Sequence, residues 1–448
     1  MPVSPARVAA FDILLRVDQQ NAYASELLHS EKLEKLSLAD RALATELVMG
    51  VLRWRSRLDE IVAAASSRPL NKLDAEVLTA LRLAVYQLRF LTRVPARAAI
   101  NESVELVKRA QKRSAAPFAN AVLRKIADTK IEPLPEAIAG DPIPFLVREF
   151  AHPEWLVKRW VAEFGVERAC AICEHNQRIP STSIRLDSVE VAQELESEGL
   201  ELAPGRLLAS ARIVVAGEAT RTRAFREGRL FIQDEASQLI AALVGTGSRL
   251  LDCCAAPGGK TAALAARNPT AEIIAAELHA HRADLLRKRV RAPNVQVINA
   301  DALALPFQGG FDRVLADVPC SGTGTLARNP EIKWRLTPED LNDLHARQVG
   351  ILRAALQQLT PGGRAVYSTC SLEPEENTAV VEEVLSDAAG FELRECRDEL
   401  KRLRETGELV WNDLDSLLNG KFLRTLPGVQ PCDGFFAAVV ERVDSENP

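Results

Sequence analysis

Strand-like and helix-like patterns alternate along the second half of the chain, and this alternation constrains the fold more than any other feature. Short apolar runs typical of buried strands recur from residue 233 onward, and helical patterns separate them. Strands joined through helices usually pair in parallel, with helices on both faces of the sheet. The predicted strands cover residues 249–253, 272–277, 295–298, 313–317, 364–368, 391–395 and 435–440. We therefore expect a Rossmann-like, seven-stranded α/β domain over residues 233–448, with ligands beyond the carboxyl ends of the strands.

The first 130 residues show helical periodicity with no interrupting strand signal. Apolar residues recur at helical spacing, for example at Val8, Phe11 and Leu14, which predicts an all-α domain over residues 1–130. Prolines cluster in residues 131–146, and a run of fixed φ angles favours a linker over a helix.

Residues 147–232 combine both kinds of pattern. Helical patterns at 153–175 and 189–198 alternate with strand-like segments at 181–186 and 211–215. Because the segments are few and short, we expect a small α+β domain between the helical domain and the α/β domain.

Composition excludes several classes of protein. The chain has 448 residues, of which 47% are hydrophobic and 26% charged, which is globular material for two to three domains. Asp12 and Arg16 interrupt the apolar start, so no secretory signal is expected. The longest apolar runs, such as 239–244, fall well short of the roughly 20 residues that cross a bilayer. We expect a cytoplasmic protein with no membrane partner.

Eight cysteines without an export signal are expected to be reduced thiols. Cys170 and Cys173 form a single Cys-x-x-Cys within a helical pattern. Closed zinc sites normally need four converging ligands. We therefore interpret this pair as part of a core and expect no metal site.

A glycine-rich turn follows the first strand of the α/β domain. Its paired glycines let a ligand approach the backbone closely, and its spacing matches neither a dinucleotide fingerprint nor a Walker loop. Glu277 and Asp301 end the next two strands, where carboxylates can accept the hydroxyls of a nucleoside. Either acid alone is more often a helix cap or a loop end, but both together favour a nucleoside cofactor. The turn itself consists of Cys254, Ala255, Ala256, Pro257, Gly258, Gly259 and Lys260.

Two cysteines follow later strands of the same domain. Cys320 follows Pro319, and Cys370 follows Thr369. A buried cysteine is usually a small apolar filler, but these two are expected to open into one cleft beside the cofactor turn. A thiolate that adds to C6 of cytosine makes C5 nucleophilic enough to accept a methyl group.

These motifs resemble those of the RNA cytosine-5 methyltransferases, and nearly the whole chain resembles the bacterial 16S rRNA methyltransferases of the RsmB (Fmu/Sun) family. The helical domain resembles a NusB-like RNA-binding domain. The matching segments are 40–41, 46–53, 100–104 and 120–124 in the helical domain and 433–436 near the C-terminus.

The resemblance implies a role for each candidate residue. Cys370 attacks C6, and Cys320 assists loss of the C5 proton and release of the enzyme. Asp317 hydrogen-bonds the N3 and amine edge of the base. Lys333, in the matching segment 328–334, contacts the base or its phosphate.

The implied cofactor is S-adenosyl-L-methionine. The resemblance places it against the glycine-rich turn, with Glu277 on the ribose and Asp301 on the adenine edge, and with Lys260 and Asp317 beside the cofactor or the target. Glu277 stands where many relatives have Asp, and Val318 where Ala is usual. Both departures leave the reactive groups in place.

The resemblance also implies the partner, which is 16S rRNA in an unassembled or partly assembled small subunit, with cytosine 967 as the family target. We expect a monomer. The net charge is −5, but basic residues are in excess in the first 140 residues, and local clusters could bind phosphates.

Two alternatives remain open. A tRNA or 23S rRNA cytosine would suit the same reaction. A catalytically inert, NusB-like RNA-binding or transcription factor belongs to another class, against which the intact Cys320, Cys370, Asp317 and paired glycines argue.

Overall fold

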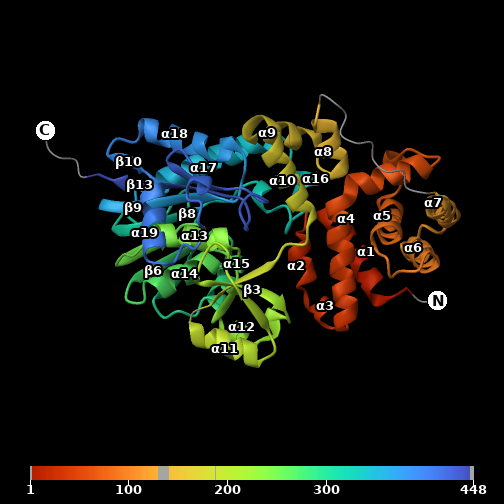
Figure 1. Cartoon of the computed structure of the whole chain (residues 1–448), viewed down its shortest axis with the longest axis horizontal. Helices are drawn as coiled ribbons and strands as arrows, with labels where there is room; N and C mark the ends of the chain where they lie inside the picture. Colours follow the sequence, from red (N-terminus) through yellow and green to blue (C-terminus); the bar gives the residue numbers. More distant parts are fainter. Residues whose placement is uncertain (1–2, 130–140, 187, 444–448) are drawn as a thin grey trace. The chain divides into compact units, whose positions relative to one another are not determined.

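The computed structural model describes residues 3–129, 141–186 and 188–443, which form two compact units (Figure 1). The first unit comprises Met1–Ile179 with the separate segment Leu326–Arg335. The second comprises Pro180–Thr325 and Leu336–Pro448.

The described part of the first unit is helical. Its helices are α1 (Pro5–Gln20), α2 (Ala24–Leu28), α3 (Glu31–Glu34), α4 (Leu38–Ala65), η1 (Leu70–Lys72), α5 (Ala75–Phe90), α6 (Ala96–Arg109), η2 (Arg113–Ala115), α7 (Ala116–Asp128), α8 (Ile143–Glu149), α9 (Glu154–Phe164), α10 (Val166–Gln177) and α16 (Ile332–Arg335). Helices α4 and α5 approach closely at Gly50, where a Cβ would lie 2.0 Å from Cζ of Tyr86. The Tyr86 hydroxyl donates to Oε1 of Glu46 at 2.5 Å. The predicted all-α domain is confirmed.

Three predictions for this region differ from the structure. Most of the predicted linker 131–146 lies outside the described residues, but its end begins α8, with Pro144 in the first helical turn, where proline is tolerated. The predicted helix 153–175 is divided into α9 and α10 by Gly165 at a φ of 79°. Residues 147–179, predicted to open the middle domain, belong to the first unit. Gln177 of this region donates to the carbonyl of Arg53 in α4 at 3.1 Å.

A small antiparallel sheet opens the second unit, with the strand order β2-β3-β1-β4. Helix α11 packs over it through Leu195, which is buried with Ile184 and Leu230 of the sheet. The elements are β1 (Thr182–Leu186), α11 (Val189–Ser197), β2 (Glu201–Pro204), β3 (Ala211–Ala216), η3 (Ala219–Arg221), α12 (Arg223–Glu227) and β4 (Leu230–Ile232).

A larger sheet follows, in the order β11-β12-β13-β9-β8-β5-β6-β7, with β10 paired to β13. Its elements are α13 (Glu235–Val244), β5 (Arg249–Asp252), α14 (Gly259–Arg267), β6 (Glu272–Glu277), α15 (Ala280–Arg289), β7 (Val295–Asn299), β8 (Phe311–Asp317), η4 (Thr323–Thr325), α17 (Asp340–Leu356), β9 (Leu359–Thr369), η5 (Pro374–Glu376), α18 (Thr378–Asp387), β10 (Phe391–Arg394), α19 (Cys396–Glu405), η6 (Asp415–Leu417), β11 (Leu418–Asn419), β12 (Phe422–Thr425) and β13 (Phe435–Arg442).

All seven predicted strands are present, but the sheet is mixed and has nine strands in the described residues. Strands β7, β6, β5, β8 and β9 are parallel neighbours. Strand β13 runs antiparallel to β9, and β10 and β12 run antiparallel to β13. The expected parallel sheet is therefore correct for the part that carries the site and wrong for the edge.

Successive residues of each central strand enter opposite cores. Leu250 and Ile273 pack with α13, α14 and α19, whereas Leu251 and Ile274 pack with α17 and α18. Figure 1 shows these two sets of helices on opposite faces of the large sheet. With both faces covered, the carboxyl edge of the parallel strands is where polar side chains can gather.

Candidate active site

The glycine-rich turn connects β5 to α14. Gly258 caps the helix at a φ of 106°, a conformation that favours glycine, and a Cβ there would lie 2.7 Å from Cδ1 of Leu286 and 2.8 Å from Cγ2 of Val290. At Gly259 a Cβ would meet only the Gln233 amide, at 3.4 Å. The turn itself therefore requires a glycine at position 258, but it does not require one at position 259.

Asp252, which the sequence analysis did not single out, ends β5 beneath this turn. It is 1% exposed, and its Oδ2 accepts the hydroxyl of Thr261 at 2.7 Å. Burial raises the pKa of Asp252 to about 7, against the opposing effect of the Thr261 hydrogen bond. The sequence signal that could have identified Asp252 is its position at the end of a strand, just before the turn.

Glu277 is the last residue of β6 and Asp301 lies two residues after β7, and these strands are parallel neighbours. Glu277 is 4% exposed, and its Oε1 accepts the N–H of His279 at 3.0 Å. Arg282 lies 3.6 Å from the same oxygen and donates to the carbonyl of Ala256 in the turn at 3.3 Å. Asp301 Oδ1 accepts the N–H of Leu303 at 3.0 Å. The two acids therefore stand at the carboxyl ends of neighbouring parallel strands, at the edge that also carries the turn.

Asp317 ends β8 and is held by two partners. Its Oδ2 accepts from Nζ of Lys260 at 2.8 Å, and its Oδ1 accepts from the Ser368 hydroxyl at 2.8 Å. Lys260 also lies over the Phe435 ring, 5.0 Å from its centroid. Burial lowers the pKa of Lys260, but Asp317 and Cys370 raise it more, so the ammonium form is favoured. The ion pair joins the cofactor turn to the strand that leads to Cys320.

The two cysteines meet at the ends of the neighbouring strands β8 and β9. Their sulfurs are 3.3 Å apart, and the N–H of Cys370 also points at Sγ of Cys320 at 3.3 Å. The hydrogen bond with Cys370 and burial raise the pKa of Cys320 well above its ordinary value. The structure therefore brings together Cys320, Cys370, Asp317 and Lys260, as the sequence analysis expected.

Lys333 has a different environment from the one expected. It belongs to the segment Leu326–Arg335 of the first unit, is 1% exposed, and donates from Nζ to the carbonyls of Arg53 and Ala151, each at 2.9 Å. Burial lowers its pKa to about 7. An amine whose donors are taken by buried backbone carbonyls is not available to a base or a phosphate. The expected contact of Lys333 with the base or its phosphate is therefore replaced by contacts with backbone carbonyls of the first unit.

No group of three or more His, Cys, Asp or Glu side chains suited to a metal occurs in the described residues. Cys173 is buried in α10 and Cys170 is partly buried. Likewise, no helix in residues 3–129, 141–186 or 188–443 is long and apolar enough to span a bilayer.

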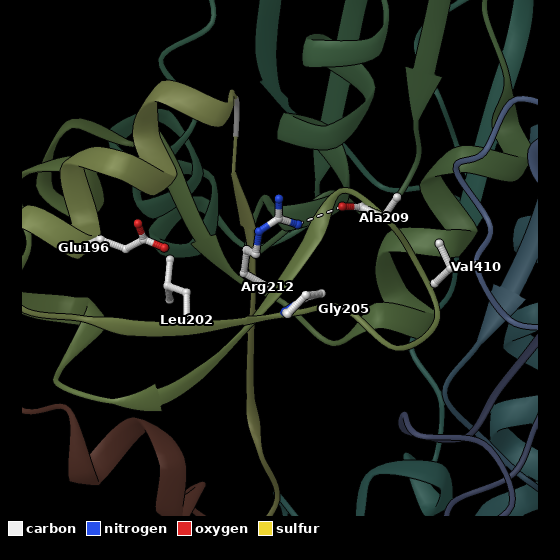
Figure 2. Close-up of a pocket in the computed structure, with 7 residues that line it drawn as sticks. Glu196, Leu202, Gly205, Ala209, Arg212 and Val410 are labelled. Atoms are coloured by element: carbon white, nitrogen blue, oxygen red, sulfur yellow. Dashed lines mark hydrogen bonds between the residues drawn. The ribbon is translucent and has the colours of Figure 1, made fainter.

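A separate pocket of about 540 Å³ lies between the small sheet and Val410 (Figure 2). Its two charged side chains are Glu196 and Arg212, and Arg212 donates to the carbonyls of Ala209 at 2.8 Å and Ala211 at 2.7 Å. No thiol or predicted site residue lines it. The candidate active site is therefore the cysteine and cofactor-turn edge, not this pocket.

Comparison with known proteins agrees with this geometry. Residues 243–441 match the family described as 16S rRNA methyltransferase RsmB/F, residues 4–128 match the NusB family, and residues 152–217 match the RsmF/B-like ferredoxin-like domain. The last match crosses the boundary between the two compact units.

Full-length relatives and one solved structure agree as well. A Bacillus subtilis protein named probable ribosomal RNA small subunit methyltransferase B is 34% identical, covering 97% of this chain and 98% of its own. Ribosomal RNA small subunit methyltransferase B of Pseudomonas syringae is 36% identical, covering 86% and 87%. The crystal structure of PH0851 has the same fold, with a TM-score of 0.81 at 23% identity over 99% of this chain and all of its own. The chain belongs to the RsmB/F family of 16S rRNA methyltransferases.

Proposed function

We propose that this chain methylates C5 of one cytosine of 16S rRNA, cytosine 967 in the family, through a bond between Cys370 and C6. Its family membership makes it an S-adenosylmethionine-dependent rRNA methyltransferase. The observation that carries the finer proposal is the pair of cysteine sulfurs 3.3 Å apart at the ends of β8 and β9.

The residues of the carboxyl edge suit the cofactor. The turn from Cys254 to Lys260 exposes backbone at Gly259, where a Cβ has no contact closer than 3.4 Å. Glu277 offers a buried carboxylate for ribose hydroxyls, and the partly buried Asp301 offers a carboxylate for the adenine edge. When bound there, S-adenosylmethionine supplies the methyl group.

The protein's own groups account for the remaining steps. The Cys370 thiolate bonds to C6, and the electron pair of the C5–C6 double bond makes C5 a nucleophile that takes the methyl group. Cys320 then assists removal of the C5 proton, the double bond re-forms, and Cys370 leaves as a thiolate.

Asp317 is suited to orient the base. Lys260 and Ser368 each donate to one of its oxygens and fix the carboxylate. Each oxygen keeps a further lone pair, which can accept the amine N–H of the base and the N3–H that forms as the thiolate adds. The base must leave its stack to reach both a thiol and a methyl donor, which favours a loop or opened RNA segment.

The test incubates purified protein and radiolabelled S-adenosylmethionine with unmodified 16S rRNA. Wild type is expected to form 5-methylcytosine at one site. Cys370→Ala should form none, and Cys320→Ala should accumulate a covalent RNA adduct. Cys170→Ala, which removes a partly buried thiol from α10, is the matched control and should behave as wild type.

Other outcomes decide between the alternatives. Labelling of tRNA or 23S rRNA but not 16S rRNA would preserve the chemistry and overturn the substrate. No label in any RNA, despite binding, would favour the inert RNA-binding factor. An adduct in Cys370→Ala instead of Cys320→Ala would reverse the roles of the two thiols.

A further inference from the structure

One buried carboxylate joins the two cysteine segments. Glu376, in η5, is 0% exposed. Its Oε1 accepts the backbone N–H of Ser321 at 2.8 Å, and its Oε2 accepts the hydroxyls of Ser321 and Ser371. Ser321 directly follows Cys320, and Ser371 directly follows Cys370. A single side chain therefore contacts the residue next to each thiol.

Further contacts fix this carboxylate within the fold. Gln348 of α17 donates from Nε2 to Oε1 of Glu376 at 2.9 Å and to the carbonyl of Pro319 at 2.9 Å. The Tyr367 hydroxyl donates to the carbonyl of Glu376 at 2.6 Å. The Ser321 and Ser371 hydroxyl oxygens are themselves 3.0 Å apart. Removing the carboxylate would leave several buried donors without an acceptor, so both segments would be expected to shift.

We propose that Glu376 is a positioning residue for methyl transfer: its carboxylate holds the two cysteine segments side by side and places a negative charge beside Cys320. This inference rests on the proposed function, because it takes the two cysteines as the reactive pair.

The charged groups that act on Cys320 and on Cys370 include groups of opposite sign. The side-chain hydrogen bond with Cys370, burial, the charge of Cys370 and the negative charge of Glu376 raise the pKa of Cys320, and the backbone N–H of Cys370 opposes them. The charge of Cys370 contributes to the raised pKa of Lys260, so the cation nearest to Cys370 is the Lys260 ammonium. A cation thus acts on one thiol and an anion on the other.

Other ionisable groups near the pair do not reverse this order. The pKa of Tyr367 is raised well above its ordinary value, chiefly by burial, so its hydroxyl stays neutral. Asp317 is paired with Lys260. Glu373 is also buried in the loop that carries Ser371.

The same arrangement allows Cys320 to act later in the reaction. Once the sulfur of Cys370 is bonded to carbon, it no longer carries the charge or the hydrogen bond that opposes ionisation of Cys320. Cys320 can then release its proton to solvent and, as a thiolate, take the proton from C5.

The first test needs no RNA. Full-length wild type and Glu376→Gln are treated with iodoacetamide over a range of pH, and alkylation of each cysteine is followed by peptide mass spectrometry. In wild type Cys370 should react at lower pH than Cys320. In Glu376→Gln the pH profile of Cys320 should move to lower pH, because the negative charge that raised its pKa is gone. The same order and the same profile in both proteins would overturn the proposal.

The second test follows methyl transfer in a single turnover. Glu376→Gln should lower the rate about 100-fold, as expected for a misplacement of about 1 Å in the reacting groups, with RNA affinity and S-adenosylmethionine binding unchanged. Glu375→Gln, which removes the same charge from the neighbouring, partly buried position, is the control and should keep the wild-type rate and the wild-type alkylation order.

A third variant separates position from folding. Ser321→Ala removes one hydroxyl donor to Glu376 but keeps the charge, so the rate should fall by about tenfold or less while Cys320 still reacts at high pH. This variant remains informative if Glu376→Gln does not fold, and an unchanged rate in it would contradict the positioning role. If wild type methylates no RNA, the proposed function fails, but the alkylation order still decides the role of Glu376.

Discussion

At the scale of single residues, the two glycines of the cofactor turn are expected to differ in what they tolerate. Gly258→Ala puts a Cβ within 2.8 Å of Leu286 and Val290 at a positive φ, so we expect a loss of about 1–3 kcal/mol in the free energy of unfolding. Gly259→Ala meets only an ordinary contact with Gln233 and should leave stability nearly unchanged.

Thermal unfolding and S-adenosylmethionine titration of both variants make the comparison. If Gly259→Ala alone keeps its stability but loses the cofactor, its backbone contacts the ligand. Equal losses of stability in the two variants would contradict the packing argument for Gly258.

Asp252 is expected to give stability an unusual pH dependence. Its folded pKa of about 7 lies above its ordinary value of 3.8, so the folded state binds the proton more tightly and stability falls as pH rises between those values. Asp252→Asn removes this titration. Relative to the variant, wild type should lose about 2 kcal/mol in the free energy of unfolding between about pH 5 and about pH 7. Urea unfolding of both proteins at the two pH values measures it, and a constant difference would mean that Asp252 ionises normally.

The predictability of the site residues follows from where they stand in the chain. Asp317, Cys320 and Cys370 end parallel strands, and strand ends can be read from the sequence because apolar runs stop there. Glu376 could not be chosen in advance, because Glu373, Glu375 and Glu376 lie close together and only the fold decides which of them contacts both serines. Lys333 was misread because a basic residue in a matching motif looks the same whether it is exposed or buried.

At the scale of elements, the parallel strands of the large sheet could be predicted from the sequence, whereas part of its antiparallel edge could not. Strands β5 to β9 were predicted because each is a distinct apolar run. Strand β11 has only 2 residues, too short to show a period. The antiparallel direction of β13 depends on its hydrogen bonds to β9, which the sequence does not display.

The segment Leu326–Arg335 is an element whose packing explains several motif residues. Arg53 donates to the carbonyl of Ala327 at 3.0 Å, Trp334 donates to the carbonyl of Leu52 at 2.6 Å, and Lys333 donates to that of Arg53. The NusB-like motif that contains Arg53 therefore serves packing within the first unit.

Lys333 should make this packing sensitive to alkaline pH. Its folded pKa of about 7 lies below its ordinary value of 10.5, so the unfolded state binds more protons and stability rises with pH between those values. Relative to Lys333→Met, which does not titrate, wild type should gain about 2 kcal/mol between about pH 7 and about pH 9. Urea unfolding at the two pH values tests this. Lys401→Met, at an exposed position of α19, is the control, and a similar gain relative to it would argue against burial as the cause.

At the scale of the whole molecule, a net charge of −5 must be reconciled with an RNA substrate. Part of the basic character of the first unit is already neutralised, because Arg55 pairs with Asp18 at 2.9 Å and Arg57 with Glu60 at 2.5 Å. Arg109 at the end of α6 and Arg113 in η2 are exposed. These two are therefore better candidates for phosphate contacts than the cluster around Arg53.

Reversing both charges tests this surface. Each phosphate contact contributes about 0.7–0.9 to the slope of log affinity against log salt, so Arg109→Glu with Arg113→Glu should weaken 16S rRNA binding and lower that slope by about 1.4–1.8. Anisotropy titrations across a salt series measure both quantities. Lys401→Glu with Arg404→Glu makes the same change in net charge on α19, where both residues are exposed. If both pairs weaken binding equally, the effect is one of overall charge; if only the first pair lowers the slope, the end of α6 contacts phosphates.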